Sequence, residues 1–347
     1  MKLQHIGVHH IKKATIMARK TRKAEQLKQE IVNSVPVEQR EMITQPITFT
    51  YLNGEMTMLQ TRIQTMIMEK LQERIASALQ KRAKGGFTGE LFTDADFAPL
   101  PNGHTKYLTF EVKYSELGVE PSHYDDIDKA ALAMQSIIHS KELTDEHGKK
   151  YVEYTVVFDK VTIPVKTKGR VERRDSIKLR MLPETAHDLF NIIPYHRYLK
   201  DAVFLFRSGY SGRMYLLINA NKRLGTWKIS YQKLRKILLA SYDNDTKQLS
   251  VEKYPEVYDF KRRVLDVAKK EIDKAADRVD CTFDYELEYP HGKRRGTPEN
   301  IVFRIHMTDL GKSIMQKKLD CKPADAVEIK EETKPIKQPT DKSLNEW

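Results

Sequence analysis

Six basic residues lie close together in the second half of the chain: Lys261, Arg262, Arg263, Lys269, Lys270 and Lys274. On a helical wheel of about 100° per residue, the apolar residues of the same segment fall within about 80° of Val264. They are Val257, Phe260, Ala268, Ile272 and Ala275. Every basic residue except Lys261 then points away from this apolar face, and Lys261 lies beside it. Because guanidinium and ammonium groups can bond guanine and neutralise phosphates, we predict a DNA-binding helix over Tyr254–Ala276.

A second cationic group follows this helix at the tip of a predicted hairpin, between the strands Cys281–Tyr289 and Ile301–His306. It consists of Lys293, Arg294 and Arg295, and it is flanked by glycines. A helix followed by a basic hairpin, or wing, is typical of DNA-binding proteins. We add Tyr258, on the helix itself, to the candidate DNA contacts. The alternative is an ordinary solvated face, because three aspartates share the basic side of the helix: Asp259, Asp266 and Asp273.

The first half of the chain offers a weaker candidate. A helix is expected from Pro121-Ser122 to about His139, and three aspartates crowd its start: Asp125, Asp126 and Asp128. Their charge suits the helix dipole but repels phosphate, which leaves Lys129 and Tyr124 as candidate contacts. We therefore expect this half to supply weaker DNA contacts, a dimer surface, or both. A basic linker at 166–180 either follows backbone phosphates or binds nothing; its candidate contacts are Arg170, Arg173 and Arg174.

The elements that must position these residues predict an α+β fold. A long helix over Met56–Lys81, a strand over Lys106–Val112 and a hairpin formed by Tyr151–Phe158 and Val161–Val165 are expected in the first half. The segment Thr109–Leu117 is then repeated at Thr226–Leu234, with the same Tyr and Leu at the same places. A repeat of this kind predicts two copies of one unit, that is, two tandem winged-helix domains.

The predicted organisation has five parts. A basic N-terminal arm at 1–45 precedes a first winged-helix domain at 46–165, the linker at 166–180, a second winged-helix domain at 181–320 that makes the main DNA contacts, and a disordered C-terminal tail at 321–347.

Composition favours a polyanionic partner, because 60 Lys and Arg against 48 Asp and Glu give a net charge of +12. No apolar run is long enough to span a membrane, and the N-terminus does not resemble a signal peptide, so we expect a soluble, cytoplasmic protein, and the family resemblance described below implies a bacterial one. The cysteines Cys281 and Cys321 are too few for a disulfide framework or a cysteine-built zinc site.

Several enzyme classes are alternatives to a DNA-binding protein that has no catalytic activity. Asp94 and Asp96 could hold Mg²⁺ in an element-encoded primase, although such a pair is more often a turn or a cap. An ATPase is not favoured: Gly311-Lys312-Ser313 is similar to the end of a phosphate-binding loop, but the first glycine of that motif is missing. A rolling-circle relaxase is not favoured either, because it would need a His-x-His pair that the sequence does not contain. We therefore expect no catalytic residues, no cofactor and no metal. His5, His9 and His10 could bind a metal ion, but an unstructured surface arm is the favoured interpretation of this segment. A winged-helix transcriptional regulator stays open as an alternative.

The residues of the C-terminal helix, from Tyr254 through Val264 to Ile272, resemble the two-winged-helix initiator proteins of iteron-containing bacterial plasmids. The helix start Leu59–Arg62 and the turn Leu117–Val119 are similar to the first domain of that family. This resemblance implies a replication initiator of a plasmid or mobile element, one that binds repeats in double-stranded origin DNA. It also implies host partners, namely a helicase and a DnaA-like initiator, and both monomeric and homodimeric forms.

Overall fold

The computed structural model describes residues 41–83, 91–99, 106–164, 175–190, 194–243, 248–290 and 296–320. The expectations for the arm up to residue 40, the arginines at 170–174, the hairpin tip at 293–295 and the tail from 321 lie outside these ranges. Cys281 is buried and has a free thiol. Within the described ranges, no helix is long and apolar enough to cross a membrane.

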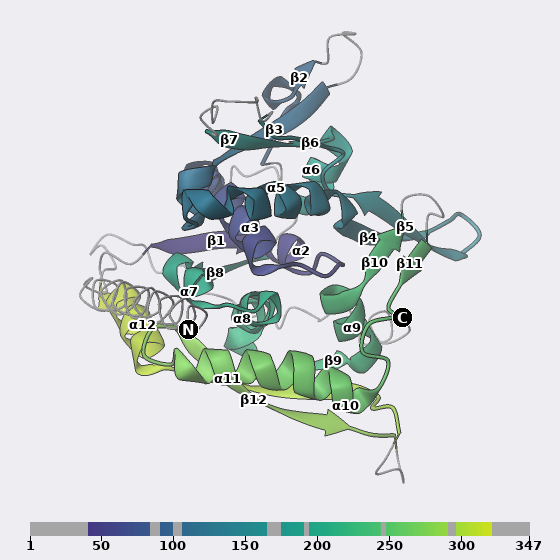
Figure 1. The fold of residues 1–347 in the computed structure, drawn as a ribbon, viewed down its shortest axis with the longest axis vertical. Coiled ribbons are helices and arrows are strands. Elements are labelled where there is room, and N and C mark those ends of the chain that lie inside the picture. Colours follow the sequence, from purple (N-terminus) through teal and green to yellow (C-terminus); the bar gives the residue numbers. More distant parts are fainter. Residues whose placement is uncertain are drawn as a thin grey trace, which may run out of the picture. The chain divides into compact units, whose positions relative to one another are not determined.

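The second winged-helix domain has a three-stranded sheet whose order is β12-β13-β9 (Figure 1). Its elements are α8 (Gly209–Asn221), β9 (Thr226–Ser230), α9 (Tyr231–Leu239), β10 (Ser241–Asp243), β11 (Gln248–Ser250), α10 (Val257–Phe260), a π-helical turn (Lys261–Leu265), α11 (Asp266–Lys274), β12 (Cys281–Glu288) and β13 (Asn300–Met307). The helix α12 (Asp309–Asp320) follows. Throughout, "recognition helix" denotes α10, the π-helical turn and α11 together.

The first winged-helix domain repeats this order. Its elements are α3 (Met58–Lys70), α4 (Gln72–Ala83), β2 (Ala98–Pro99), β3 (Lys106–Lys113), a 3-10 turn (Tyr114–Leu117), α5 (Tyr124–Ala133), β6 (Lys160–Thr162) and β7 (Ser176–Met181). The sheet order is β2-β3-β7-β6, so β6, β7 and β3 neighbour one another as β12, β13 and β9 do. The predicted α+β fold of two tandem winged-helix domains is confirmed.

The sequence repeat corresponds to a repeat of contacts. Tyr114 and Tyr231 are both buried at the start of the helical element that follows β3 and β9, and their backbone N–H groups donate to equivalent carbonyls. Tyr114 N donates to Asp175 O at 3.2 Å, just before β7, and Tyr231 N donates to Glu299 O at 3.0 Å, just before β13. The same tyrosine therefore closes the corner between helix and sheet in each domain.

The hairpin of the first domain differs from the prediction. The strand β4 (Ile138–Thr144) pairs with β5 (Lys150–Val156), and the predicted pairing of Tyr151–Phe158 with Val161–Val165 is wrong, because β6 pairs instead with β7. The helix expected to reach His139 ends at Ala133. Asp145 stabilises the turn of the true hairpin, since its Oδ1 accepts from the backbone N–H groups of His147 and Lys149.

Two segments outside the predicted domains are strands. Met42–Pro46 (β1) falls in the range expected for the arm, and β7 occupies the end of the range expected for the linker. Their apolar residues explain this, because Ile43, Ile177 and Leu179 are fully buried. A high density of lysine and arginine in the flanking sequence had masked the short alternation of buried and exposed residues.

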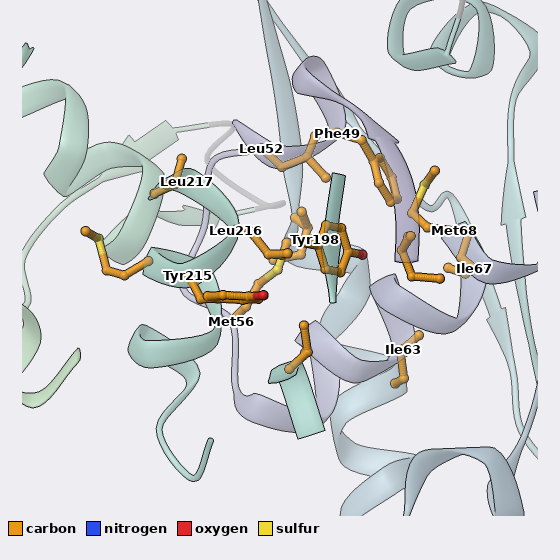
Figure 2. Close-up of a cluster of buried hydrophobic side chains, with 14 of the residues drawn as sticks. Phe49, Leu52, Met56, Ile63, Ile67, Met68, Tyr198, Tyr215, Leu216 and Leu217 are labelled. Carbon is orange, nitrogen blue, oxygen red and sulfur yellow. The ribbon is translucent and has the colours of Figure 1, made fainter. Parts of the chain in front are cut away.

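The two domains share one junction. β1 pairs antiparallel with β8 (Tyr195–Leu199), and each strand leads into a short helix, α2 (Ile47–Thr50) or α7 (Lys200–Leu205). The helix α6 (Pro183–Phe190) contacts α2. Figure 2 shows side chains of both domains packed in one apolar cluster, with Tyr198, Tyr215 and Leu216 beside residues of α2 and α3. The junction between the domains is therefore a continuous core.

Candidate nucleic-acid interface

The recognition helix is interrupted by a π-helical turn at Lys261–Leu265. A π turn adds one residue to a helical turn, so the residues before and after it keep their faces while those within it are rotated. Val264 and Leu265 are consecutive and both fully buried. The three residues before them, Lys261, Arg262 and Arg263, are all exposed.

The prediction that Lys261 packs beside the apolar face is wrong. The wheel assumed a regular α-helix, whereas the extra residue of the π turn carries Lys261 out to solvent. The rest of the predicted apolar face is confirmed, because Phe260, Val264, Ala268, Ile272 and Ala275 are buried and Val257 is half-buried. The turn thus gives the helix three consecutive exposed cations.

The two arginines are held by neighbours on the same helix. The carboxylate of Asp259 lies 3.7 Å from the guanidinium of Arg262 and 3.3 Å from that of Arg263. Arg262 also lies over the ring of Tyr258, at 5.4 Å from its centroid, and the Tyr258 side chain is 68% exposed. All of these groups face solvent, and exposed ion pairs of this kind are worth only about 0–1 kcal/mol. The arginines are consequently oriented but available to a stronger anion.

Lys269 and Lys270 differ although they are neighbours. Lys269 donates to Asp273 and lies 2.8 Å from Asp284 on β12, and it also donates to the carbonyl of Phe283 at 3.0 Å. Burial opposes the charged form of Lys269, but the two carboxylates outweigh it and raise its pKa, while the hydrogen bond from Lys269 lowers the pKa of Asp284. Lys270 is exposed. Lys269 therefore fastens the helix to the sheet, and Lys270 is the better placed for a ligand.

A buried arginine fixes the start of the recognition helix. Arg235, on α9, is 5% exposed and donates to the carbonyls of Val251, Lys253 and Tyr254 in the segment that leads into the helix. Its guanidinium also lies over the rings of Tyr231 and Phe260. Sequence reasoning missed this role, although an arginine four residues after a buried tyrosine, on the apolar face of a helix, was a signal for it.

Tyr254 has an unusual backbone next to this arginine. Its φ is +52°, in the left-handed region that a tyrosine rarely adopts and that costs about 1–3 kcal/mol. The carbonyl of Tyr254 accepts from Arg235, and its ring lies under the guanidinium of Arg263 at 5.6 Å. The strained residue thus connects the buried arginine to one of the exposed arginines.

The candidate contacts of the first domain are sparse. Lys129 is exposed and lies 3.6 Å from Asp126, while Tyr124 packs against Tyr114 with the ring centroids 4.8 Å apart. Asp128 is buried and accepts a hydrogen bond from the Tyr114 hydroxyl, so it belongs to the core. Of these residues, Lys129 alone presents a positive charge to solvent.

The acidic pair considered for a primase forms a turn. Asp94–Asp96 is a single 3-10 turn in which the Asp96 carboxylate accepts from the N–H and hydroxyl of Thr93. Arg74 binds the same carboxylate at 2.6 Å and holds the pKa of Asp96 well below its usual range. In the part of the chain that the structure describes, no three His, Cys, Asp or Glu side chains gather as a metal site. These contacts favour the structural interpretation of the pair.

Comparisons with known proteins concern mainly the second domain. The family described as "Initiator Rep protein, WH2" matches residues 245–305. No curated protein matches the chain. A crystal structure of domain 2 and domain 3 of RctB is similar with a TM-score of 0.30 and 10% identity, over 57% of this chain and 73% of that one, a likeness too low to support a conclusion.

The segment matched by the family begins before β11 and ends within β13, so it contains the whole recognition helix, β12 and most of β13. The resemblance that the C-terminal helix suggested is thereby confirmed: residues 245–305 match the second winged-helix domain of initiator Rep proteins.

Proposed function

We propose that this chain is a sequence-specific replication initiator of a plasmid or mobile element, and that it binds repeats in double-stranded origin DNA. The observation that carries the proposal is the exposed run Lys261–Arg263 on the third helix of the initiator Rep winged-helix domain. This is the helix that enters the major groove in helix-turn-helix proteins.

The geometry of the arginines suits base contacts as well as phosphate contacts. A guanidinium can bond the O6 and N7 atoms of guanine together, which is the commonest specific contact in the major groove. Asp259 holds Arg262 and Arg263 side by side before DNA arrives, so less side-chain entropy is lost on binding. Lys261 and Lys270 extend the positive surface for phosphates, and the wing tip at 293–295 is proposed to do the same.

The first domain is proposed to contribute weaker contacts through Lys129, or a surface for a second copy of the chain. The linker arginines at 170–174 are proposed as phosphate contacts. Initiation also requires that the origin be opened and a helicase loaded, so we propose a host helicase and a DnaA-like initiator as partners.

DNA selection from a random pool tests the proposal and does not require the sequence of the origin. Duplexes bound by the full chain are selected from a random double-stranded pool, and the affinity for the enriched duplex is measured by fluorescence anisotropy at several salt concentrations. We expect Arg262→Ala and Arg263→Ala each to lower the affinity about 10-fold and to reduce the slope of log K against log salt by about one.

Lys312→Ala provides the matched control, because Lys312 is an exposed lysine on α12 paired with Asp309 at 3.1 Å. Failure to enrich any duplex, or arginine variants that bind like this control, would overturn the proposal. Direct repeats of about 20 base pairs beside the gene would support the origin role, since they place one copy every two turns of DNA, whereas a palindrome would favour a transcriptional regulator.

A further inference from the structure

Two arginines occupy equivalent places on the first helices of the two domains. The helix α3 begins after the N-cap Thr57, and α8 begins after the N-cap Ser208. Arg62 and Arg213 each stand five residues after their N-cap. The strands that precede these helices, β1 and β8, pair antiparallel with one another, so a local two-fold relation connects the two helices.

The helices α3 and α8 approach closely one residue before these arginines. A Cβ added at Gly212 on α8 would lie only 3.2 Å from the methyl carbon of Thr61 on α3. Thr61 and Gly212 are again equivalent, each four residues after its N-cap. This close contact between the two helices therefore falls near the local two-fold axis, and the arginines lie next to it.

Each arginine makes the same pair of connections. Arg62 donates to the carbonyl of Leu117, in the 3-10 turn that follows β3 of its own domain, and to that of Phe204, in α7 of the other domain. Arg213 likewise donates to the carbonyl of Ile237 in α9 of its own domain, and to that of Leu52, just after α2 of the other domain. Every acceptor stands at or near the C-terminal end of a short helix.

Charge explains why carbonyls can serve as acceptors. The last carbonyls of a helix lack partners within it and carry partial negative charge. Arg213 is 1% exposed, and among the described residues its acceptors are two carbonyls and the sulfur of Met56. Burial lowers the pKa of Arg213 to about 10, so it stays charged at neutral pH. A buried cation is costly, and such groups can be retained because they specify one arrangement of the chain.

We propose that Arg62 and Arg213 are a reciprocal pair of positioning residues that fix the orientation of the two winged-helix domains relative to each other. Each guanidinium joins a helix end in its own domain to a helix end in the other, so that neither domain rotates about the junction without losing the interdomain hydrogen bond of each arginine. The consequence for DNA, a fixed separation between α5 and the recognition helix, rests on the proposed function.

Distances between spin labels test the orientation in the absence of DNA. Labels are placed at Ser77→Cys on α4 and Gln232→Cys on α9, both exposed positions, in a Cys321→Ser background. The remaining thiol, Cys281, is fully buried. Electron–electron double resonance on the full chain then gives the distribution of distances between the two domains.

Arg62→Gln and Arg213→Gln should each broaden this distribution roughly twofold, because a glutamine amide cannot reach both carbonyls. The matched control is Lys70→Gln, since Lys70 lies on α3 but contacts Glu116 within its own domain. A native distribution in both arginine variants, with only a lower melting temperature, would overturn the proposal. If Arg213→Gln does not fold, the half-buried Arg62 decides the question, with Arg62→Lys as the milder change. The spin-label experiment contains no DNA, so its outcome does not depend on whether the chain binds DNA.

Discussion

The two winged-helix domains have the same sheet order and the same buried tyrosine, yet their third helices carry opposite charge. α5 begins with Asp125 and Asp126, whereas the recognition helix exposes Lys261, Arg262 and Arg263. The fold depends on buried anchors, while the exposed face of the third helix is free to vary. Two copies of one fold can therefore serve different tasks in a single chain.

The contrast extends into the core. The hydroxyl of Tyr114 donates to the buried carboxylate of Asp128 on α5, whereas the hydroxyl of the equivalent Tyr231 accepts from Arg235 at 3.2 Å. In the first domain the tyrosine thus fastens the third helix directly. In the second domain it supports an arginine that fastens the segment before the third helix. The domain with the basic helix uses a cation as its internal support, and the domain with the acidic helix uses an anion.

The largest expected effect comes from removing the support in the second domain. Arg235→Leu leaves the carbonyls of Val251, Lys253 and Tyr254 without their donor and should destabilise the chain by about 3 kcal/mol. Urea unfolding measures this loss. DNA affinity should fall at least 10-fold even where the protein is fully folded, because Arg263 loses its position. Native affinity in the folded variant would show that Arg235 does not position the helix.

A second prediction concerns the junction between the domains. His196 on β8 is buried against Thr50 of α2, and burial lowers its pKa to about 3. The unfolded chain then binds a proton below about pH 6.5 that the folded chain does not, so stability falls as the pH falls from there towards 3. At pH 5 this loss amounts to about 2 kcal/mol relative to pH 8.

The His196→Gln variant isolates this contribution. Urea unfolding of the native chain and of the variant at pH 5 and pH 8 should show a weaker dependence on pH in the variant. Equal pH dependence in both would assign the effect to other groups and show that the junction does not control acid stability.

Asp259→Asn should increase the difference in charge between α5 and the recognition helix. The carboxylate holds both Arg262 and Arg263, and it also repels phosphate. Its removal should raise the affinity for random-sequence duplex about threefold, with a steeper dependence on salt. Because the ordering of the arginines is lost as well, discrimination in favour of a selected duplex should not increase. Weaker binding to random duplex would show that the orientation matters more than the repulsion.

The smallest effect is expected in the first domain. Lys129→Ala should lower DNA affinity only about twofold, since a single exposed lysine supplies one phosphate contact at most. Anisotropy titration against the duplex used for Arg263→Ala allows a direct comparison. A loss as large as that of Arg263→Ala would reverse the assignment of the main DNA contact.

The order of elements was predictable because buried apolar residues recur along the chain at the spacing of each element. The repeat of Thr109–Leu117 at Thr226–Leu234 predicted the tandem fold, and the apolar periodicity predicted the buried face of the recognition helix. The pairing of β4 with β5 was not predictable, because apolar runs do not state which strand they pair with. The exposure of Lys261 was missed as well, since a π turn leaves no periodic signal.

The sequence marked Arg235 as unusual, but it did not show which groups this arginine or the pair Arg62 and Arg213 would contact. The role of Arg235 depends on carbonyls that lie sixteen to nineteen residues further along the chain. The pairing of Arg62 with Arg213 depends on two helices brought together by β1 and β8. Contacts of this kind arise from tertiary packing and are read from coordinates, not from local patterns.

The π turn has a consequence for how this chain can change. Loss of one residue between Lys261 and Leu265 would restore a regular α-helix, and the segments before and after the turn would keep their buried faces. Only the side chains within the turn would change in number and direction. A single codon gained or lost among the exposed residues Lys261–Arg263 therefore offers a route to a new set of exposed side chains at this place.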